Sequence, residues 1–182
     1  MRKKIFLAMG IGLLTGLLGG CGTSYDADTN TLFIKSNGKI IETSVEQFDQ
    51  MDEEALKQFV EEELSSYCEE NDVTIKEKEF TIEGDTAKIT LEYENYEDYA
   101  GFHDKEFFVG TVVQALAAGY SIPVDFDSED KIIILEENVT VKLSGEVKTT
   151  TDNATVTEDG AVVVTGYEED DSDSGITYII YQ

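Results

Sequence analysis

Residues 73–93 read VTIKEKEFTIEGDTAKITLEY and carry the clearest structural signal in the chain. Apolar and polar residues alternate on both sides of Gly84-Asp85, a pattern typical of two antiparallel strands joined by a two-residue turn. The alternation changes parity between Ile75 and Phe80, and one extra residue at a β-bulge would restore the register. The stretch therefore predicts a β-hairpin with a bulge in its first strand.

The residues before this hairpin predict a second hairpin and a helix. Asn37-Gly38 lies between apolar runs, and a two-residue turn there would place Ile34 opposite Ile41. Asp52 can cap a helix from about 53 to 69, because apolar residues then recur along one helical face.

The residues after it continue the mixed pattern. One or two helices are expected over 96–120, with the stretch from Val109 to Tyr120 as the core helix, and short alternating segments follow from Lys131 onward. The prediction is an α+β fold, with an antiparallel sheet, two main helices and a β-rich C-terminal portion.

The β-rich portion contains an internal echo. Two copies predict a pair of similar β-hairpins, with a solenoid-like stack as the alternative. The first copy consists of Asn138, Thr140, Val141, Gly145 and Val147. The second copy lies fifteen places later and consists of Asn153, Thr155, Val156, Gly160 and Val162.

The composition combines core-forming residues with a large acid excess. The 182 residues include 39 Asp and Glu against 13 Lys and Arg, a net charge of −26, and 41% are hydrophobic. A folded domain is therefore expected rather than a disordered acidic chain. The charge argues against nucleic acid as a partner, because such affinity comes from neutralising phosphates with basic residues. It also argues against direct contact with anionic lipid.

The N-terminus has the layout of a secretory signal peptide, with basic residues at 2–4 before an apolar run over 5–18. This run is shorter than the roughly 20 residues that a membrane-spanning helix needs. It ends in Leu18-Gly19-Gly20-Cys21, which resembles the lipobox of bacterial lipoproteins. The resemblance implies cleavage before Cys21 and a diacylglyceryl group on its sulfur. An ordinary secretory signal with an incidental cysteine is the alternative.

The domain layout follows from this signal. We expect a signal peptide at 1–20, a lipidated Cys21 with a flexible tether at 21–30, and a single extracytoplasmic domain at 31–182, with a candidate sub-boundary near 124–137. The body resembles, in a general way, uncharacterised small lipoproteins of Gram-positive bacteria, which implies no activity. Cleavage would leave 10 lysines, no arginine and 39 acids, a net charge of −29. The lack of arginine argues against carboxylate or phosphate ligands.

Residues suited to catalysis are few, and no catalytic residue is assigned. His103 is the only histidine and lies on an apolar helical face, which favours a packed role. Cys68 is left without an internal partner, so it forms either a buried thiol or a pair between molecules. Glu63 projects within the apolar stripe of the 53–69 helix and is either a hydrolase acid or a side chain that reaches solvent. Zinc lacks its usual nitrogen and sulfur ligands.

Calcium is the cofactor that the composition favours most, although none is assigned. Asp125, Asp127, Glu129 and Glu136 imitate the spacing of a calcium loop, but Asp130 replaces the required glycine. The loop from 168 to 173, followed by Gly175, is a denser acidic segment. Solvated turns are the alternative for both.

An aromatic group next to acidic residues suggests a second kind of site. Tyr93, Tyr96, Tyr99 and Phe102 could stack on an uncharged sugar or pack between helix and sheet. The expected function is a membrane-anchored binding or interaction module for an envelope protein or a neutral glycan. A calcium-dependent surface module and a carboxylate-dependent hydrolase are the alternatives.

Overall fold

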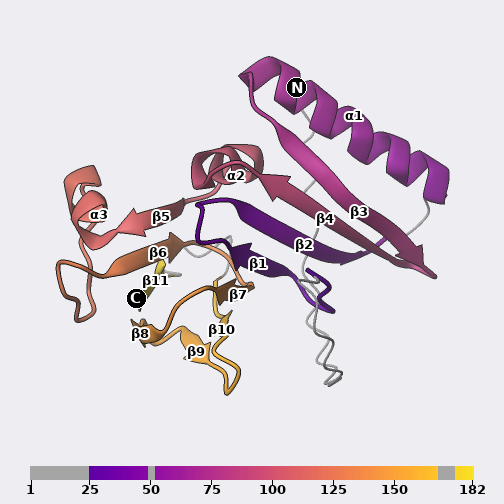
Figure 1. The fold of residues 1–182 in the computed structure, drawn as a ribbon. Helices are drawn as coiled ribbons and strands as arrows, with labels where there is room; N and C mark the ends of the chain where they lie inside the picture. The colour runs from indigo at the N-terminus through magenta and orange to yellow at the C-terminus, as the bar shows by residue number, and fades with distance from the viewer. Residues whose placement is uncertain (1–24, 49–51, 168–174) are drawn as a thin grey trace.

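A computed structural model describes residues 25–48, 52–167 and 175–182 (Figure 1). The expected leader, Cys21 and the acidic loop at 168–173 lie outside these residues. The elements in chain order are β1 (Thr31–Ile34), β2 (Ile40–Gln47), α1 (Glu53–Asn71), β3 (Ile75–Glu83), β4 (Thr86–Tyr93), α2 (Tyr96–His103), β5 (Phe107–Thr111), α3 (Val112–Ala118), β6 (Lys131–Leu135), β7 (Thr140–Leu143), β8 (Val147–Thr150), β9 (Ala154–Val156), β10 (Val162–Val164) and β11 (Thr177–Tyr181).

The strands form two sheets. The larger sheet has the order β3-β4-β2-β1-β7-β10-β9, and its β1–β7 pair is parallel. The smaller sheet has the order β5-β6-β11-β8, in which every pair is antiparallel. The predicted α+β class with mainly antiparallel pairing is confirmed.

The hairpin of β3 and β4 has the predicted form. Glu83 pairs with Thr86 across the turn, and Gly84 adopts a φ of 67°, which suits glycine. The register shifts between Glu77 and Glu79. The bulge predicted from the change of parity is therefore present.

The hairpin of β1 and β2 differs from the prediction by one residue. Ile34 pairs with Ile40 rather than Ile41. The loop has three residues instead of two, because the N–H of Lys35 donates to the carbonyl of Lys39 at 3.0 Å while Gly38 adopts a φ of 87°. This change of parity turns Ile34, Ile40 and Glu42 toward the core.

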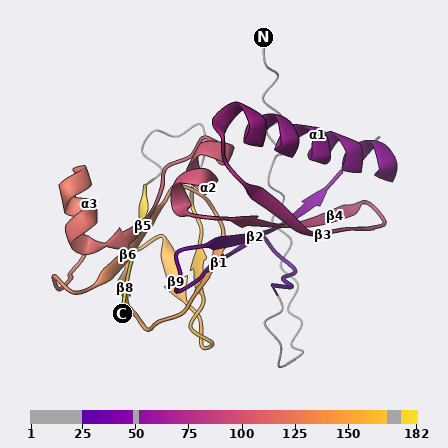
Figure 2. The same cartoon turned by 45° about the horizontal axis from the view of Figure 1, so that its top comes forward.

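The first predicted helix is confirmed as α1. The carboxylate of Asp52 accepts a hydrogen bond from the N–H of Ala55 at 2.8 Å and caps the helix. The helix lies over the part of the large sheet formed by β3 and β4 (Figures 1 and 2). Its contact with the sheet is limited, since Leu64 is the one buried residue of α1.

The prediction of a core helix from Val109 to Tyr120 is wrong. This segment divides into β5, which pairs with β6, and α3, a peripheral helix of seven residues. A capping box between Thr111 and Gln114 starts the helix directly after the strand. Leu116 is 46% exposed, whereas Val112 and Ala115 are buried.

Only the second copy of the internal echo forms a hairpin. β9 and β10 pair with each other, but β7 and β8 lie in different sheets. β8 pairs with β11 instead, and the backbones of Glu146 and Gln182 extend this contact with two mutual hydrogen bonds.

One hydrophobic cluster joins the two sheets. It contains Leu32 and Ile40 of the large sheet, Ile133 and Ile179 of the small sheet, and Leu64 of α1. Within the candidate boundary at 124–137, β6 pairs with β5 before it and with β11 after it. The chain on both sides of this segment therefore builds one sheet.

Candidate functional site

The four aromatic residues proposed for sugar stacking do not form an exposed platform. Tyr93 and Tyr99 are 0% and 1% exposed. Tyr96 packs on Phe108 with ring centroids 5.1 Å apart, and Phe102 packs on Tyr67. These rings fill the space between α2 and its neighbours, which corrects the sugar-stacking hypothesis.

The residues proposed for a calcium loop are not brought together as a metal site. The ammonium group of Lys148 lies 3.0 Å from Asp127 and 2.7 Å from Asp130, so this lysine supplies the positive charge between the two carboxylates. The buried Asp130 also accepts a hydrogen bond from the N–H of Asp127 at 2.8 Å. These contacts lower the pKa of Asp130. Among the described residues, no group of three or more Asp, Glu, His or Cys, including Asp125, Glu129 and Glu136, could hold a metal ion.

Two other candidates lie on α1. Glu63 is exposed, so the structure provides no buried acid at this position. Cys68 is half-buried and forms no disulfide with another described residue. Pairing of its thiol between molecules stays a prediction.

A buried ionic network joins β2, β4 and α2. The carboxylate of Glu42 lies 3.0 Å from Nε2 of His103 and accepts a hydrogen bond from the hydroxyl of Tyr93 at 2.6 Å. Ser44 donates to its other oxygen at 2.8 Å. The side chain of Glu42 is 9% exposed and that of His103 is 24% exposed. A carboxylate and an imidazole thus meet inside an otherwise apolar core.

Burial and pairing act in opposite directions on these groups. Burial raises the pKa of Glu42, but the charge of His103 and the hydrogen bonds from His103, Tyr93 and Ser44 outweigh it and lower the pKa to about 2. Burial lowers the pKa of His103, while Glu42 raises it more strongly, and the net shift is upward. Burial holds the pKa of Tyr93 well above its usual value. The pairing therefore favours the ionised carboxylate together with the imidazolium over the neutral forms.

The order of these groups does not suit nucleophilic catalysis. A Ser-His-acid triad needs the imidazole between the hydroxyl and the carboxylate, so that it can take the hydroxyl proton. Here Glu42 lies between Ser44 and His103. A second carboxylate, Glu137, binds Tyr99 at 2.7 Å and Lys105 at 3.2 Å at the edge of this network. The network is built to join α2 to the sheets.

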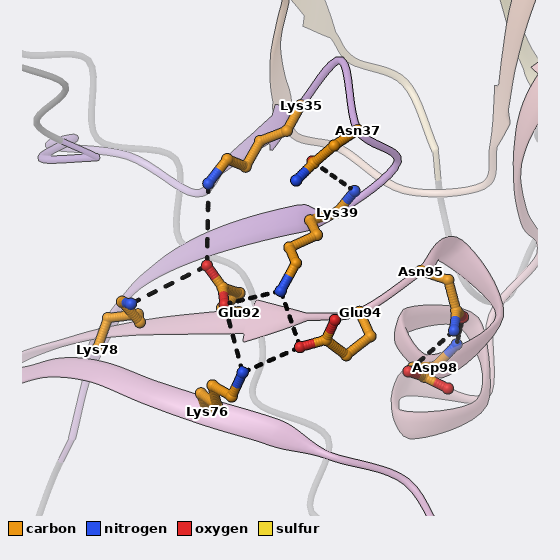
Figure 3. A network of polar contacts seen from close by, with 9 residues as sticks. All are labelled: Lys35, Asn37, Lys39, Lys76, Lys78, Glu92, Glu94, Asn95 and Asp98. Atoms are coloured by element: carbon orange, nitrogen blue, oxygen red, sulfur yellow. Dashed lines mark hydrogen bonds and ion pairs between the residues drawn. The ribbon is translucent and has the colours of Figure 1, made fainter.

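The opposite, outer face of the large sheet carries a lysine cluster (Figure 3). Four ammonium groups lie within 4.0 Å of Glu92, and two of these also bind Glu94, at 2.8 Å and 3.0 Å. The lysines come from the β1–β2 turn and from β3, and they are Lys35, Lys39, Lys76 and Lys78.

A cleft of about 220 Å³ opens beside this cluster, where the β1–β2 turn meets β5, α3, β6 and β11. No acidic residue lines it, although 39 of the 182 residues are acidic. Its lining residues are Ile34, Lys35, Ser36, Gly38, Val109, Gly110, Thr111, Gln114, Lys131, Ser144 and Tyr181.

Lys131 distinguishes this cleft from the rest of the surface. Its ammonium group lies 5.8 Å from the ring centroid of Tyr181. No carboxylate within the described part of the chain forms an ion pair with it, whereas the second lysine of the lining, Lys35, lies 3.9 Å from Glu92. The cleft is not visible in the sequence, because its residues come from five separate segments.

Comparison with known proteins adds no assignment to this geometry. No family model, no curated protein and no solved structure matches this chain. Within the residues described, no helix has the length and apolar character needed to cross a membrane.

Proposed function

We propose that the protein is a lipid-anchored extracytoplasmic binding protein whose cleft holds a small anionic group, such as the carboxylate of a sugar acid. The anchor is Cys21, at the end of the lipobox-like sequence, and the location is the outer side of the cell membrane. The observation that carries the proposal is Lys131, a lysine without a carboxylate partner among the described residues, in a cleft with no acidic lining.

The chemistry of the lining supports an anion with polar groups around it. Lys131 and Lys35 supply positive charge, and Ser36 and Ser144 supply hydroxyl groups. An ammonium group binds an anion as a point charge, whereas arginine binds it bidentately. The absence of arginine therefore excludes a bidentate clamp but not this kind of site. The cleft volume suits one sugar-sized group rather than a long chain.

No enzymatic step is part of the proposal. His103, the one histidine, is already paired with Glu42 and does not line the cleft. The envelope component that carries the anionic group would be a glycan or a protein near the membrane. The proposal thus replaces the expected neutral glycan with a partner that carries a negative charge.

The test is isothermal titration calorimetry, in which the full chain is titrated in separate experiments with glucuronic acid and with uncharged glucose. Glucuronic acid should bind, and Lys131→Gln should weaken binding about tenfold, as expected for loss of a charged hydrogen bond of about 1.5 kcal/mol. Lys57→Gln, on α1 and away from the cleft, is the matched control and should leave binding unchanged. Equal binding of both sugars, or equal effects of the two variants, would contradict the proposal.

A further inference from the structure

The lysines of the protein are concentrated on one face. The outer face of the large sheet, turned away from the hydrophobic core, carries six of the ten lysines in residues 21–182. Strand register and contacts with Glu92, Asp26 and Phe33 place them there. They are Lys35, Lys39, Lys76, Lys78, Lys88 and Lys142.

The N-terminal end of the described chain lies on this same face. The carbonyl of Tyr25 accepts a hydrogen bond from Thr43 at 2.7 Å, and its ring packs edge-on against Phe33 with centroids 5.3 Å apart. The carboxylate of Asp26 binds Lys88 at 2.6 Å. The part of the expected tether from 25 to 30 is thus held on the sheet.

This placement limits how far the outer face can be from an anchor at Cys21. Four Cα–Cα steps separate Cys21 from Tyr25, and a chain segment of that length spans at most about 14 Å. A lipid on Cys21 would therefore enter the bilayer close to the outer face, rather than close to α1 on the opposite side of the sheet (Figure 2).

The charges favour the same orientation. The six lysines share this face with seven carboxylates, Asp26, Asp28, Glu79, Glu83, Glu92, Glu94 and Asp159, so the outer face carries a net charge close to zero. Since residues 21–182 carry a net charge of −29, the rest of the chain holds nearly all of this excess. The Debye length is about 8 Å at physiological salt, so only the face nearest the bilayer interacts with its surface.

From these observations we infer that the outer face lies against the anionic surface of the membrane, with its lysines at the phospholipid headgroups. The inference rests on the proposed lipid anchor. It revises the expectation that the acid excess keeps the domain away from anionic lipid, because that expectation treats the charge as evenly spread. Juxtamembrane lysines are attracted to anionic headgroups, while the acidic faces are repelled and turn outward.

The test is acetylation of lysines in the full, processed chain, reconstituted in vesicles of phosphatidylcholine alone or mixed equally with phosphatidylglycerol. Mass spectrometry gives the labelling rate of each lysine. In the anionic vesicles, Lys76 and Lys142 should react at least threefold more slowly than in the neutral ones. Lys57 on α1 and Lys105 after α2 should not change and serve as controls within the same molecule. About 1 M salt, which reduces the Debye length to about 3 Å, should remove the protection.

A variant adds a matched comparison. Lys76→Gln with Lys142→Gln should lower the protection of Lys35 and Lys78 at least twofold, whereas Lys57→Gln with Lys105→Gln should leave it intact. The mass of the peptide that contains Cys21 shows whether this cysteine carries a lipid. A lipidated chain whose outer-face lysines label equally in both vesicles overturns the inference alone, and a chain without lipid overturns the anchor and the inference together.

Discussion

Glu42 and Glu92 lie on neighbouring strands, β2 and β4, and point to opposite faces of the large sheet. Their side chains are almost equally covered, at 9% and 10% exposed. Among the residues that the structure describes, Glu42 has one cationic partner, His103, and accepts hydrogen bonds from the hydroxyls of Tyr93 and Ser44. Glu92 has four lysines around it, and these are 25–49% exposed.

The difference shows that the arrangement of partners, rather than burial alone, decides how much a charged side chain contributes to the stability of the fold. Around Glu92 the positive charge is divided among four side chains in contact with water, so each can move and each is screened by salt. Around Glu42 the partners are few and fixed, and their surroundings exclude most of the water. Loss of a single partner should therefore matter far more at Glu42 than at Glu92.

The largest expected effect is that of His103→Leu. This variant leaves the carboxylate of Glu42 in the core without a cation, and it should lower the free energy of unfolding by about 3 kcal/mol. Lys39→Leu, which removes one of the four lysines near Glu92, should cost a third of that or less. Urea unfolding followed by circular dichroism measures both changes.

A double variant separates the loss of the pair from the loss of packing. Glu42→Leu with His103→Leu replaces both charges with apolar side chains and should regain most of the lost stability. Equal losses for His103→Leu and Lys39→Leu would remove the proposed contrast between the two faces.

The second effect is a pH dependence confined to the core pair. The raised pKa of His103 gives stability that is present below about pH 6.5 and is lost as the pH rises through the raised value. The lowered pKa of Glu42 gives stability that is present above about pH 4.5 and is lost as the pH falls toward 2. The stability difference between the wild type and Glu42→Gln should therefore be greatest between about pH 4.5 and 6.5.

Proton NMR provides a direct measurement, because His103 is the only histidine in the chain. Its imidazole should titrate above pH 6.5 in the wild type and below this value in Glu42→Gln, where burial remains but the carboxylate charge is absent. An unchanged titration in the variant would show that Glu42 does not control His103. The net charge, −26 at pH 7, changes with pH in the wild type and in every variant. The difference in stability between two chains at the same pH is therefore compared, because this shared effect then cancels.

The fold could be predicted where local signals agreed. The alternation around Gly84, the change of parity before Phe80 and the cap at Asp52 each led to the observed element. The core helix predicted from Val109 to Tyr120 is wrong, because apolar spacing does not distinguish a buried strand from a helix. Pairing of β5 with β6, a tertiary contact, decided its conformation.

The core pair could not be predicted, and one residue of loop length explains why. With the expected two-residue turn, Ile34 and Ile41 would share the core face, and Glu42 would point to solvent. The three-residue loop reverses this parity and buries Glu42 beside His103. Asn37-Gly38 is compatible with both loops, so no local signal revealed the charge in the core.

The smallest expected effect is at Glu92. Salt concentration, rather than pH, is the condition that distinguishes this residue from Glu42. Glu92→Gln leaves four lysines near each other, with Glu94 as the carboxylate partner of two of them, Lys39 and Lys76. This should lower the free energy of unfolding by about 1 kcal/mol at low salt. In 1 M sodium chloride the loss should fall to less than half, because the Debye length shrinks to about 3 Å. Glu42→Gln should show the same loss in both conditions, since its partners are buried, and Glu63→Gln on the exposed side of α1 should show no measurable change in either. A salt-dependent loss at Glu42 would mean that water and ions reach the core pair.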